Sequence, residues 1–157
     1  MNAKQYLEQV KKIDKIIFNK QSEIEQWKTI AESITVPIIE RVQTSGNPQK
    51  MAEAVHRIVE IQNDISECIN RYSSIKMDII KTIEILPAEE YDLLHKVYIG
   101  RTINAKLPGS SKPEKITEYM TLKEYASMKN RTYNWATVVY GRALRNVQRE
   151  LDKRNTS

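Results

Sequence analysis

The chain of 157 residues is long enough for one compact domain or two small ones, and 40% of its residues are hydrophobic, enough to bury a core. It contains only four Gly and five Pro against 29% charged residues. Because few turn formers allow few turns, this composition disfavours an all-β sandwich or a doubly wound sheet and favours long helices. One cysteine excludes an internal disulfide and a cysteine-built zinc site.

The sequence shows neither a run of about eighteen apolar residues nor an apolar signal-peptide core behind its first residues. We therefore expect a cytoplasmic protein without a membrane partner. Charge is divided unevenly: residues 1–99 carry 13 Lys and Arg and 15 Asp and Glu, whereas residues 100–157 carry 12 and 5. This asymmetry predicts one module with an anionic partner, most often nucleic acid, joined to a module that binds nothing charged in particular.

The first part of the chain predicts a long helix. Between residues 6 and 34, apolar residues recur in alternating steps of four and three, which is the heptad pattern of a coiled-coil helix. Only Lys20 interrupts this series. Pro37 predicts the end of the helix at Thr35 or Val36, because proline disrupts the helical turn that precedes it.

A second long helix is predicted after a turn at residues 44–48, and a helix over residues 49–86 would be about 55 Å long. A helix of this length cannot bury itself, so residues 1–86 are predicted to form an antiparallel coiled-coil hairpin for dimerisation or interaction. A narrow hairpin would leave one apolar row of the second helix exposed, and either a second copy of the chain or the C-terminal module could cover it. The homodimer is favoured. The residues assigned to this oligomerisation row are Ile58, Ile65, Tyr72 and Ile79.

Residues 87–157 predict a second module. Pro87, followed by two acidic residues in a first helical turn, starts a new helix that should end at Gly100. Residues 100–120 contain the most turn-rich segment of the chain and are predicted to be a mobile insertion.

A short helix and a long helix are predicted after this insertion. Thr121-Leu122-Lys123-Glu124 is a capping box that opens the short helix, residues 128–131 supply a polar turn, and Thr132 caps a last helix running to about Leu151. This arrangement is the helix-turn-helix pattern, whose second helix fits the major groove of duplex DNA. The inner face of the last helix is expected to consist of Ala136, Val139, Tyr140, Ala143, Val147 and Leu151.

Several segments resemble known families. The segments that resemble region 4 of sigma-70 factors are Leu86-Pro87, Glu90-Tyr91, Leu94, Tyr98, Thr121 to Ala126 and Gly141-Arg142-Ala143-Leu144. The segments that match the N-terminal half of the ArpU-like phage regulators are Tyr6-Leu7, Lys11 to Asp14, Val42 to Ser45 and Lys50 to Val55. The whole chain is similar to that family, in which a helical hairpin precedes a helix-turn-helix. The resemblance implies an all-α, prophage-encoded, sequence-specific DNA-binding transcriptional regulator of late phage genes.

Two departures from the family concern the DNA-binding part. About twenty residues separate the Tyr98 helix from the capping box where the family has a few, and Trp135 and Ala136 stand where the family has polar and β-branched residues. The base preference of the family is therefore not transferred to this chain.

The resemblance implies that the exposed start of the last helix reads bases in double-stranded DNA. The residues assigned to base contacts are Arg131, Tyr133, Asn134 and Thr137. The residues assigned to phosphate contacts are Lys123, Lys129, Thr132, Arg142 and Arg145. An isolated Lys or Arg on a helix can also simply belong to a solvent-exposed face. Tyr133 and Trp135 could instead pack against the short helix, and for Trp135 this packing is favoured over contact with DNA.

Two other functions stay open. The hairpin could belong to a protein-interaction module that docks RNA polymerase, or the chain could be the small subunit of a phage packaging terminase, which also joins a helix-turn-helix to an oligomerising helical part. An enzyme is not expected, because the sequence has no Gly-rich phosphate loop, no nucleophile elbow and no zinc-protease motif. No cofactor or metal is expected either.

Overall fold

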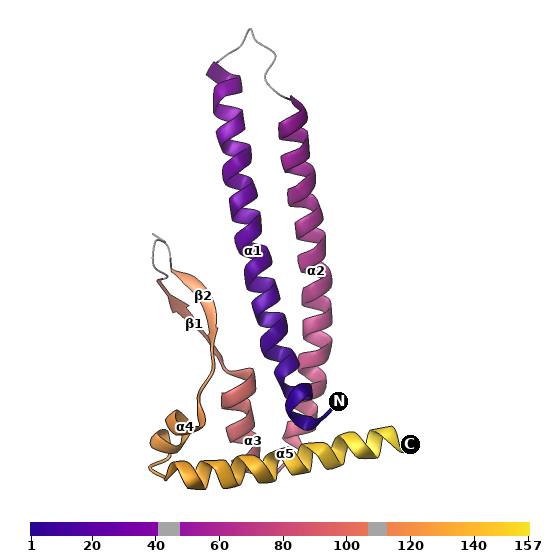
Figure 1. Ribbon diagram of the computed structural model, residues 1–157, viewed down its shortest axis with the longest axis vertical. Helices are drawn as coiled ribbons and strands as arrows, with labels where there is room; N and C mark the ends of the chain where they lie inside the picture. The colour runs from indigo at the N-terminus through magenta and orange to yellow at the C-terminus, as the bar shows by residue number, and fades with distance from the viewer. Residues whose placement is uncertain (41–47, 107–112) are drawn as a thin grey trace. The chain divides into compact units, whose positions relative to one another are not determined.

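The computed structural model describes residues 1–40, 48–106 and 113–157 (Figure 1). Within these ranges the chain is mostly helical, which confirms the expected class of an all-α protein apart from two short strands. The elements are α1 (Ala3–Glu40), α2 (Pro48–Glu84), α3 (Ala88–Leu94), the π-helix η1 (His95–Ile99), β1 (Arg101–Ala105), β2 (Glu114–Glu118), α4 (Leu122–Met128) and α5 (Tyr133–Asn155). The predicted turn at residues 44–48 lies largely outside the described residues.

The chain divides into two compact units at positions other than the expected boundary at residue 86. Unit 1 consists of residues 1–12 and 74–157, and unit 2 consists of residues 13–73. The first turns of α1 and the last turns of α2 therefore belong to the same unit as α3, α4 and α5. This division matters because the base of the helix pair supports the C-terminal module.

Unit 2 contains the long parts of α1 and α2, which run antiparallel. Ile24 of α1 packs in a buried cluster with Ile61 and Ile65 of α2. Two ion pairs flank this cluster: Lys20 Nζ lies 3.4 Å from an Asp64 carboxylate oxygen, and Arg57 Nη2 lies 3.0 Å from Glu23 Oε1. The apolar series in the sequence thus marks the contact between the two helices.

The expected oligomerisation row is largely covered within the chain. Ile79 is fully buried, Ile65 is 9% exposed, and Ile58 and Tyr72 are half-buried. Two of the four side chains are therefore buried and two are partly exposed, so less of this row is open than expected, and the homodimer stays a prediction. Other apolar side chains of α2 are exposed, among them Val55, Val59 and Ile69.

The expected end of α1 is also wrong. The helix continues past Pro37 to Glu40. Proline removes one backbone hydrogen bond and crowds one turn, and a helix of 38 residues tolerates this perturbation close to its end.

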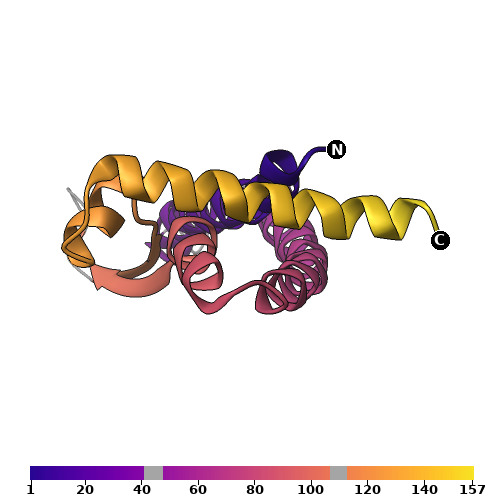
Figure 2. The same ribbon diagram turned by 90° about the horizontal axis from the view of Figure 1, so that it is seen from below.

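Unit 1 places α3, α4 and the base of the helix pair along α5 (Figure 2). The buried face of α5 consists of Ala136, Val139, Ala143 and Val147, as expected from the sequence. Tyr140 and Leu151 are half-buried at its edges. The helix also extends beyond the expected end near Leu151, to Asn155.

The described residues of the segment 100–120 include two paired strands where a mobile insertion was expected. Strands β1 and β2 pair antiparallel, with Ile103 opposite Ile116, and Arg101 Nε lies 2.9 Å from Glu118 Oε2. The backbone amide of Met120 also donates to the carbonyl of Lys96 at 3.0 Å. Strand pairing satisfies the backbone of this segment, so the described part of it is ordered structure. Residues 107–112 lie outside the described ranges.

Gly100 links η1 to this hairpin and permits its geometry. Its φ is +70°, and a Cβ at this position would lie 2.3 Å from the carbonyl oxygen of Glu118. Only glycine adopts this conformation without strain and leaves space for the returning strand. The predicted helix end at Gly100 is therefore confirmed, with a close backbone approach as an additional reason.

Candidate nucleic-acid interface

The short turn between α4 and α5 fixes the start of α5. Asn130 adopts a left-handed conformation with φ of 56°, and the amide of Arg131 donates to the carbonyl of Ala126 at 2.8 Å. Thr121 Oγ1 accepts from the amide of Glu124 at 3.2 Å, and Thr132 Oγ1 accepts from the amide of Trp135 at 3.1 Å. Both predicted N-caps are confirmed, so each helix begins where the sequence placed it.

An aromatic pair holds the two helices together. The rings of Tyr125 and Trp135 stack with centroids 6.1 Å apart and an interplanar angle of 4°. Tyr125 is only 1% exposed, and its hydroxyl donates to Asp92 of α3 at 2.8 Å. The favoured packing role of Trp135 agrees with this geometry, and the pair ties α4, α5 and α3 into one body.

The residues assigned to base contacts lie at the exposed start of α5. Arg131, Tyr133 and Asn134 are exposed, whereas Thr137 is half-buried. The Thr137 hydroxyl donates to the backbone carbonyl of Asn134 at 2.7 Å. The Arg131 guanidinium lies over the Trp135 ring, 5.6 Å from its centroid. Three of these four side chains are therefore accessible, and the Thr137 hydroxyl is already occupied as a donor.

The residues assigned to phosphate contacts differ in how far the protein already occupies them. Lys129 lies 3.4 Å from a carboxylate oxygen of Asp92, and Arg142 lies 3.7 Å from a carboxylate oxygen of Glu89. Part of the positive charge of these two side chains is thus balanced within the molecule. Arg145, in contrast, is exposed on α5 and makes no ion pair within the described part of the chain.

The remaining two assigned residues lie near the turn. The Lys123 ammonium lies 5.7 Å from the centroid of the Tyr133 ring. Thr132 is exposed, and its hydroxyl already accepts the capping hydrogen bond described above. All nine assigned side chains therefore belong to α4, the turn and the part of α5 from Tyr133 to Arg145.

Asp92 is a half-buried anchor of this region that sequence reasoning missed. Its carboxylate pairs with Lys96 one turn along the helix and lies close to Lys129, in addition to accepting from Tyr125. Burial is the largest single influence and opposes ionisation. The hydrogen bonds from Lys96 and Tyr125, helped by Lys129, together outweigh it and lower the pKa of Asp92. The only local feature of the sequence that indicates this role of Asp92 is its spacing of four residues from Lys96.

A second missed anchor connects α3 and η1 to the middle of α5. Glu90 is only 5% exposed, and its carboxylate accepts from the Asn146 amide at 2.8 Å. The hydroxyls of Tyr98 and Tyr140 lie 2.5 Å apart, and their rings stack. Burial, with the neighbouring hydroxyl of Tyr140, raises the pKa of Tyr98. Glu90, in the acidic first turn of α3, therefore also connects α3 to α5, in addition to its favourable position at the start of the helix dipole.

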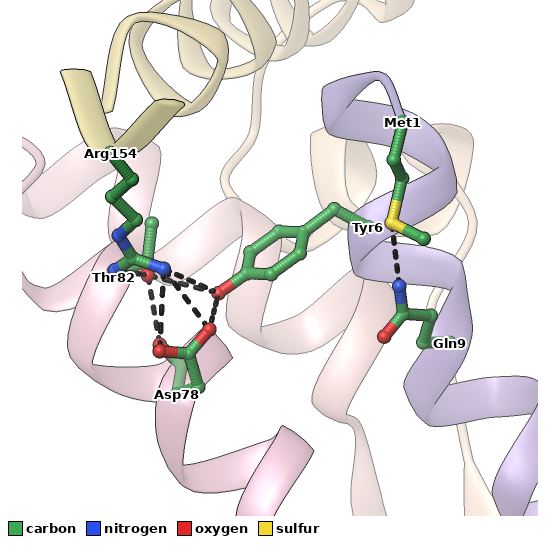
Figure 3. Close-up of polar contacts among 6 residues, drawn as sticks. All are labelled: Met1, Tyr6, Gln9, Asp78, Thr82 and Arg154. Carbon is green, nitrogen blue, oxygen red and sulfur yellow. Dashed lines mark hydrogen bonds and ion pairs between the residues drawn. The ribbon is translucent and has the colours of Figure 1, made fainter. Parts of the chain in front are cut away.

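A polar cluster holds the far end of α5 to the base of the helix pair (Figure 3). Tyr6 of α1 donates to Asp78 of α2, and the Arg154 guanidinium bonds both Asp78 at 3.1 Å and Thr82 Oγ1 at 2.6 Å. Burial and the nearby Asp78 carboxylate raise the pKa of Tyr6. The backbone amide of Ala3 also donates to Gln148 at 2.8 Å. Thus α5 is held at both ends, and its outer face stays uncovered within unit 1.

The comparisons with known proteins found no matching family model, no matching curated protein and no matching solved structure. Within residues 1–40, 48–106 and 113–157, no group of three His, Cys, Asp or Glu side chains is placed to hold a metal ion. A search of the same ranges found no helix with the length and apolar character that a membrane crossing requires.

Proposed function

We propose that the protein binds double-stranded DNA through α4 and α5, acting as a helix-turn-helix of the kind found in region 4 of sigma-70 factors. The observation that carries this proposal is the composition of the exposed part of α5: from Tyr133 to Arg149 the helix holds three arginines and no acidic residue. A helix about 10–12 Å across fits the major groove, where the four base pairs can be distinguished. The biological role we propose is a prophage-encoded, sequence-specific transcriptional regulator of late phage genes.

In this proposal the start of α5 reads base edges. Arg131 can pair with guanine and Asn134 with adenine through two-point contacts, each worth about 1–3 kcal/mol of discrimination. Both side chains are exposed, as such contacts require. Tyr133, which is 51% exposed, supplies a flat surface for contact with the groove. Thr137 retains only an acceptor role, because its hydroxyl proton is directed to a backbone carbonyl.

The proposed phosphate contacts differ in strength. Arg145 and Lys123 are exposed and carry charges that no described carboxylate balances, so they are the strongest candidates. Lys129 and Arg142 would have to share their charges with Asp92 and Glu89. Thr132 would offer only its hydroxyl proton, because its oxygen already caps α5.

The test is a DNA-binding titration of the purified full-length chain. Duplexes are selected from a random pool, labelled with fluorescein and followed by anisotropy over a salt series. We expect affinity to fall steeply with salt and Arg145→Ala to reduce the slope of log K against log salt by about 1. Asn134→Ala should relax the preference at one base position. Lys15→Ala, an exposed substitution in unit 2, is the matched control and should leave the slope unchanged. A lack of salt-dependent binding would refute the proposal.

One observation favours a second role, protein interaction, for the helix pair, which we propose to be a coiled-coil hairpin. Val55, Val59 and Ile69 of α2 are 44–48% exposed, and Val55 and Val59 help line an open apolar hollow. We propose that a second copy of the chain covers this surface, because helix-turn-helix proteins commonly bind paired half-sites as dimers.

Light scattering of the purified protein tests this second role. We expect a dimer, and Val59→Glu should yield a monomer because it places a charge in the apolar contact. A ring of many subunits would favour a terminase small subunit instead. A monomer that retains RNA polymerase in a pull-down through residues 13–73 would favour the polymerase-docking alternative. Either result would refute the homodimer.

A further inference from the structure

Gly141 lies at the centre of the outward face of α5. The buried face of this helix consists of Ala136, Val139, Ala143 and Val147. With about 100° between successive residues, the opposite side of the helix is the row Asn134, Val138, Gly141 and Arg145, in steps of four, three and four. Asn134 and Arg145 are exposed, and Val138 is 53% exposed. Gly141 therefore interrupts a row of side chains that all point away from the protein.

Nothing described inside the chain requires glycine at this position. A Cβ added to Gly141 would meet no atom within 4 Å, and the backbone there is ordinary α-helix without a positive φ. Gly100 is the opposite case, because a Cβ there would lie 2.3 Å from a carbonyl oxygen. Within a helix glycine is less favourable than any other residue except proline. The protein thus carries an unfavourable helix residue with no contact of its own to explain it.

The surroundings of Gly141 indicate an anionic partner that comes close to the helix backbone. Arg145 lies four positions further along and makes no ion pair within the described residues. Arg142 lies one position along and shares its charge with Glu89 of α3 at 3.7 Å, and α5 itself has no acidic residue before Glu150. The missing side chain beside these two arginines gives a bulky anionic group access to the helix itself. Glycine commonly marks such close approaches between a protein backbone and a ligand.

We infer that Gly141 is the point at which α5 makes its closest approach to a sugar–phosphate strand of bound duplex DNA, beside Arg142 and Arg145. This inference rests on the proposed DNA-binding function. Gly141 lies about 12 Å along the helix from Tyr133, at 1.5 Å per residue. The major groove is also about 12 Å wide. A helix whose first residues contact base edges therefore passes the phosphates that border the groove at about the position of Gly141.

The experiment compares Gly141→Ala and Gly141→Leu with the unchanged full-length chain. Binding is measured by anisotropy with a fluorescein-labelled 30-base-pair duplex of mixed sequence at low salt, and folding is measured by thermal unfolding. We expect Gly141→Ala to raise Tm, because alanine is the better helix residue and its methyl group meets nothing. The same variant should bind the duplex about tenfold more weakly, and Gly141→Leu more weakly still.

Asn155→Leu, an exposed change at the far end of the same helix, is the matched control and should leave Kd unchanged. If the unchanged chain binds duplex and Gly141→Ala binds it equally well, the inference is wrong while the proposed function stands. If the unchanged chain binds no duplex, both are refuted. If light scattering shows that Gly141→Ala converts a dimer into a monomer, Gly141 contacts a second copy, and the inference is again refuted.

Discussion

Asp92 shows how much of the candidate interface depends on a single side chain. It accepts from Tyr125 and pairs with both Lys96 and Lys129, so it connects α3, α4 and the turn that precedes α5. The sequence indicates only the local part of this arrangement, the spacing of four to Lys96. The contact with Tyr125 spans 33 residues, and no periodic pattern encodes a contact at that separation. Glu90 and Asn146, which are 56 residues apart, could not be paired from the sequence for the same reason.

We predict that Asp92→Asn lowers the free energy of unfolding by about 1–3 kcal/mol, because the two cations lose their partner while Tyr125 keeps an acceptor. Urea unfolding measures the change, with Asp152→Asn as a control on the exposed side of α5. The difference should depend on pH. Because the folded protein lowers the pKa of Asp92, its contribution is present above the ordinary value of 3.8 and is lost as pH falls through the lowered pKa. An equal difference at pH 7 and at pH 2 would contradict this explanation.

At the level of whole elements, local signals predicted the starts of α4 and α5 better than the ends of α1 and α5. Thr121 and Thr132 were expected to cap α4 and α5, and both do, because a cap depends only on the next three residues. The β-hairpin was missed even though Thr102-Ile103 and Ile116-Thr117 are β-branched pairs that favour strands. The turn-forming residues between the two strands indicated a loop instead. The pairing itself is not visible in a local pattern, because it joins residues up to 17 positions apart, such as Arg101 and Glu118.

The cap of α5 provides a test at this scale. Thr132→Ala should lower the free energy of unfolding by about 1 kcal/mol, because the amide of Trp135 loses its acceptor. Thr132→Ser, which keeps the hydroxyl, should restore most of the stability. Chemical denaturation measures both variants. Equal loss in the alanine and serine variants would show that the methyl group of Thr132, and not the cap, supports the helix.

The two helix-associated glycines of unit 1 should respond in opposite directions. Gly100→Ala is expected to destabilise the protein by about 1–3 kcal/mol, since it combines a positive φ with a close carbonyl oxygen. Gly141→Ala is expected to stabilise it by about 1 kcal/mol, since its site is open and helical. Parallel urea titrations of the two variants measure the contrast. A destabilising Gly141→Ala would mean that the outward face of α5 is covered by another part of the protein.

At the scale of the whole molecule, composition and heptad spacing predicted the helical class and the two long helices, because these features repeat along the chain. They did not predict that residues 1–12 and 74–86 belong to the compact unit that contains α5. That assignment depends on side chains such as Tyr6 and Arg154, which are 148 positions apart. For a related reason the sequence did not predict that Ile65 and Ile79 of α2 are buried within the chain, because periodicity identifies an apolar face without saying what covers it.

The polar cluster at the base of the helix pair gives a test at this scale. Tyr6→Phe removes the hydroxyl that bonds Asp78 and lies next to Thr82 and Arg154, and should lower the free energy of unfolding by about 1–2 kcal/mol. Tyr91→Phe is the control, because no hydrogen bond of its hydroxyl occurs within the described residues. Thermal and urea unfolding measure both variants. If Tyr6→Phe had the same free energy of unfolding as the unchanged protein, burial of the ring alone would be enough to hold α1 to this unit.

The contacts between the first turn of α1 and the last turns of α5 also constrain how the protein reaches its native state in the cell. The amide of Ala3 leaves the ribosome 145 residues ahead of its acceptor on Gln148. Long-range contacts of this kind form late and slowly, because distant segments must meet before any energy is gained. During translation α2 can pair with α1 early, while the base of the pair still lacks α5. A nascent chain stalled before α5 would therefore expose the apolar surface around Ala3 and Tyr6, which is the kind of surface that chaperones bind.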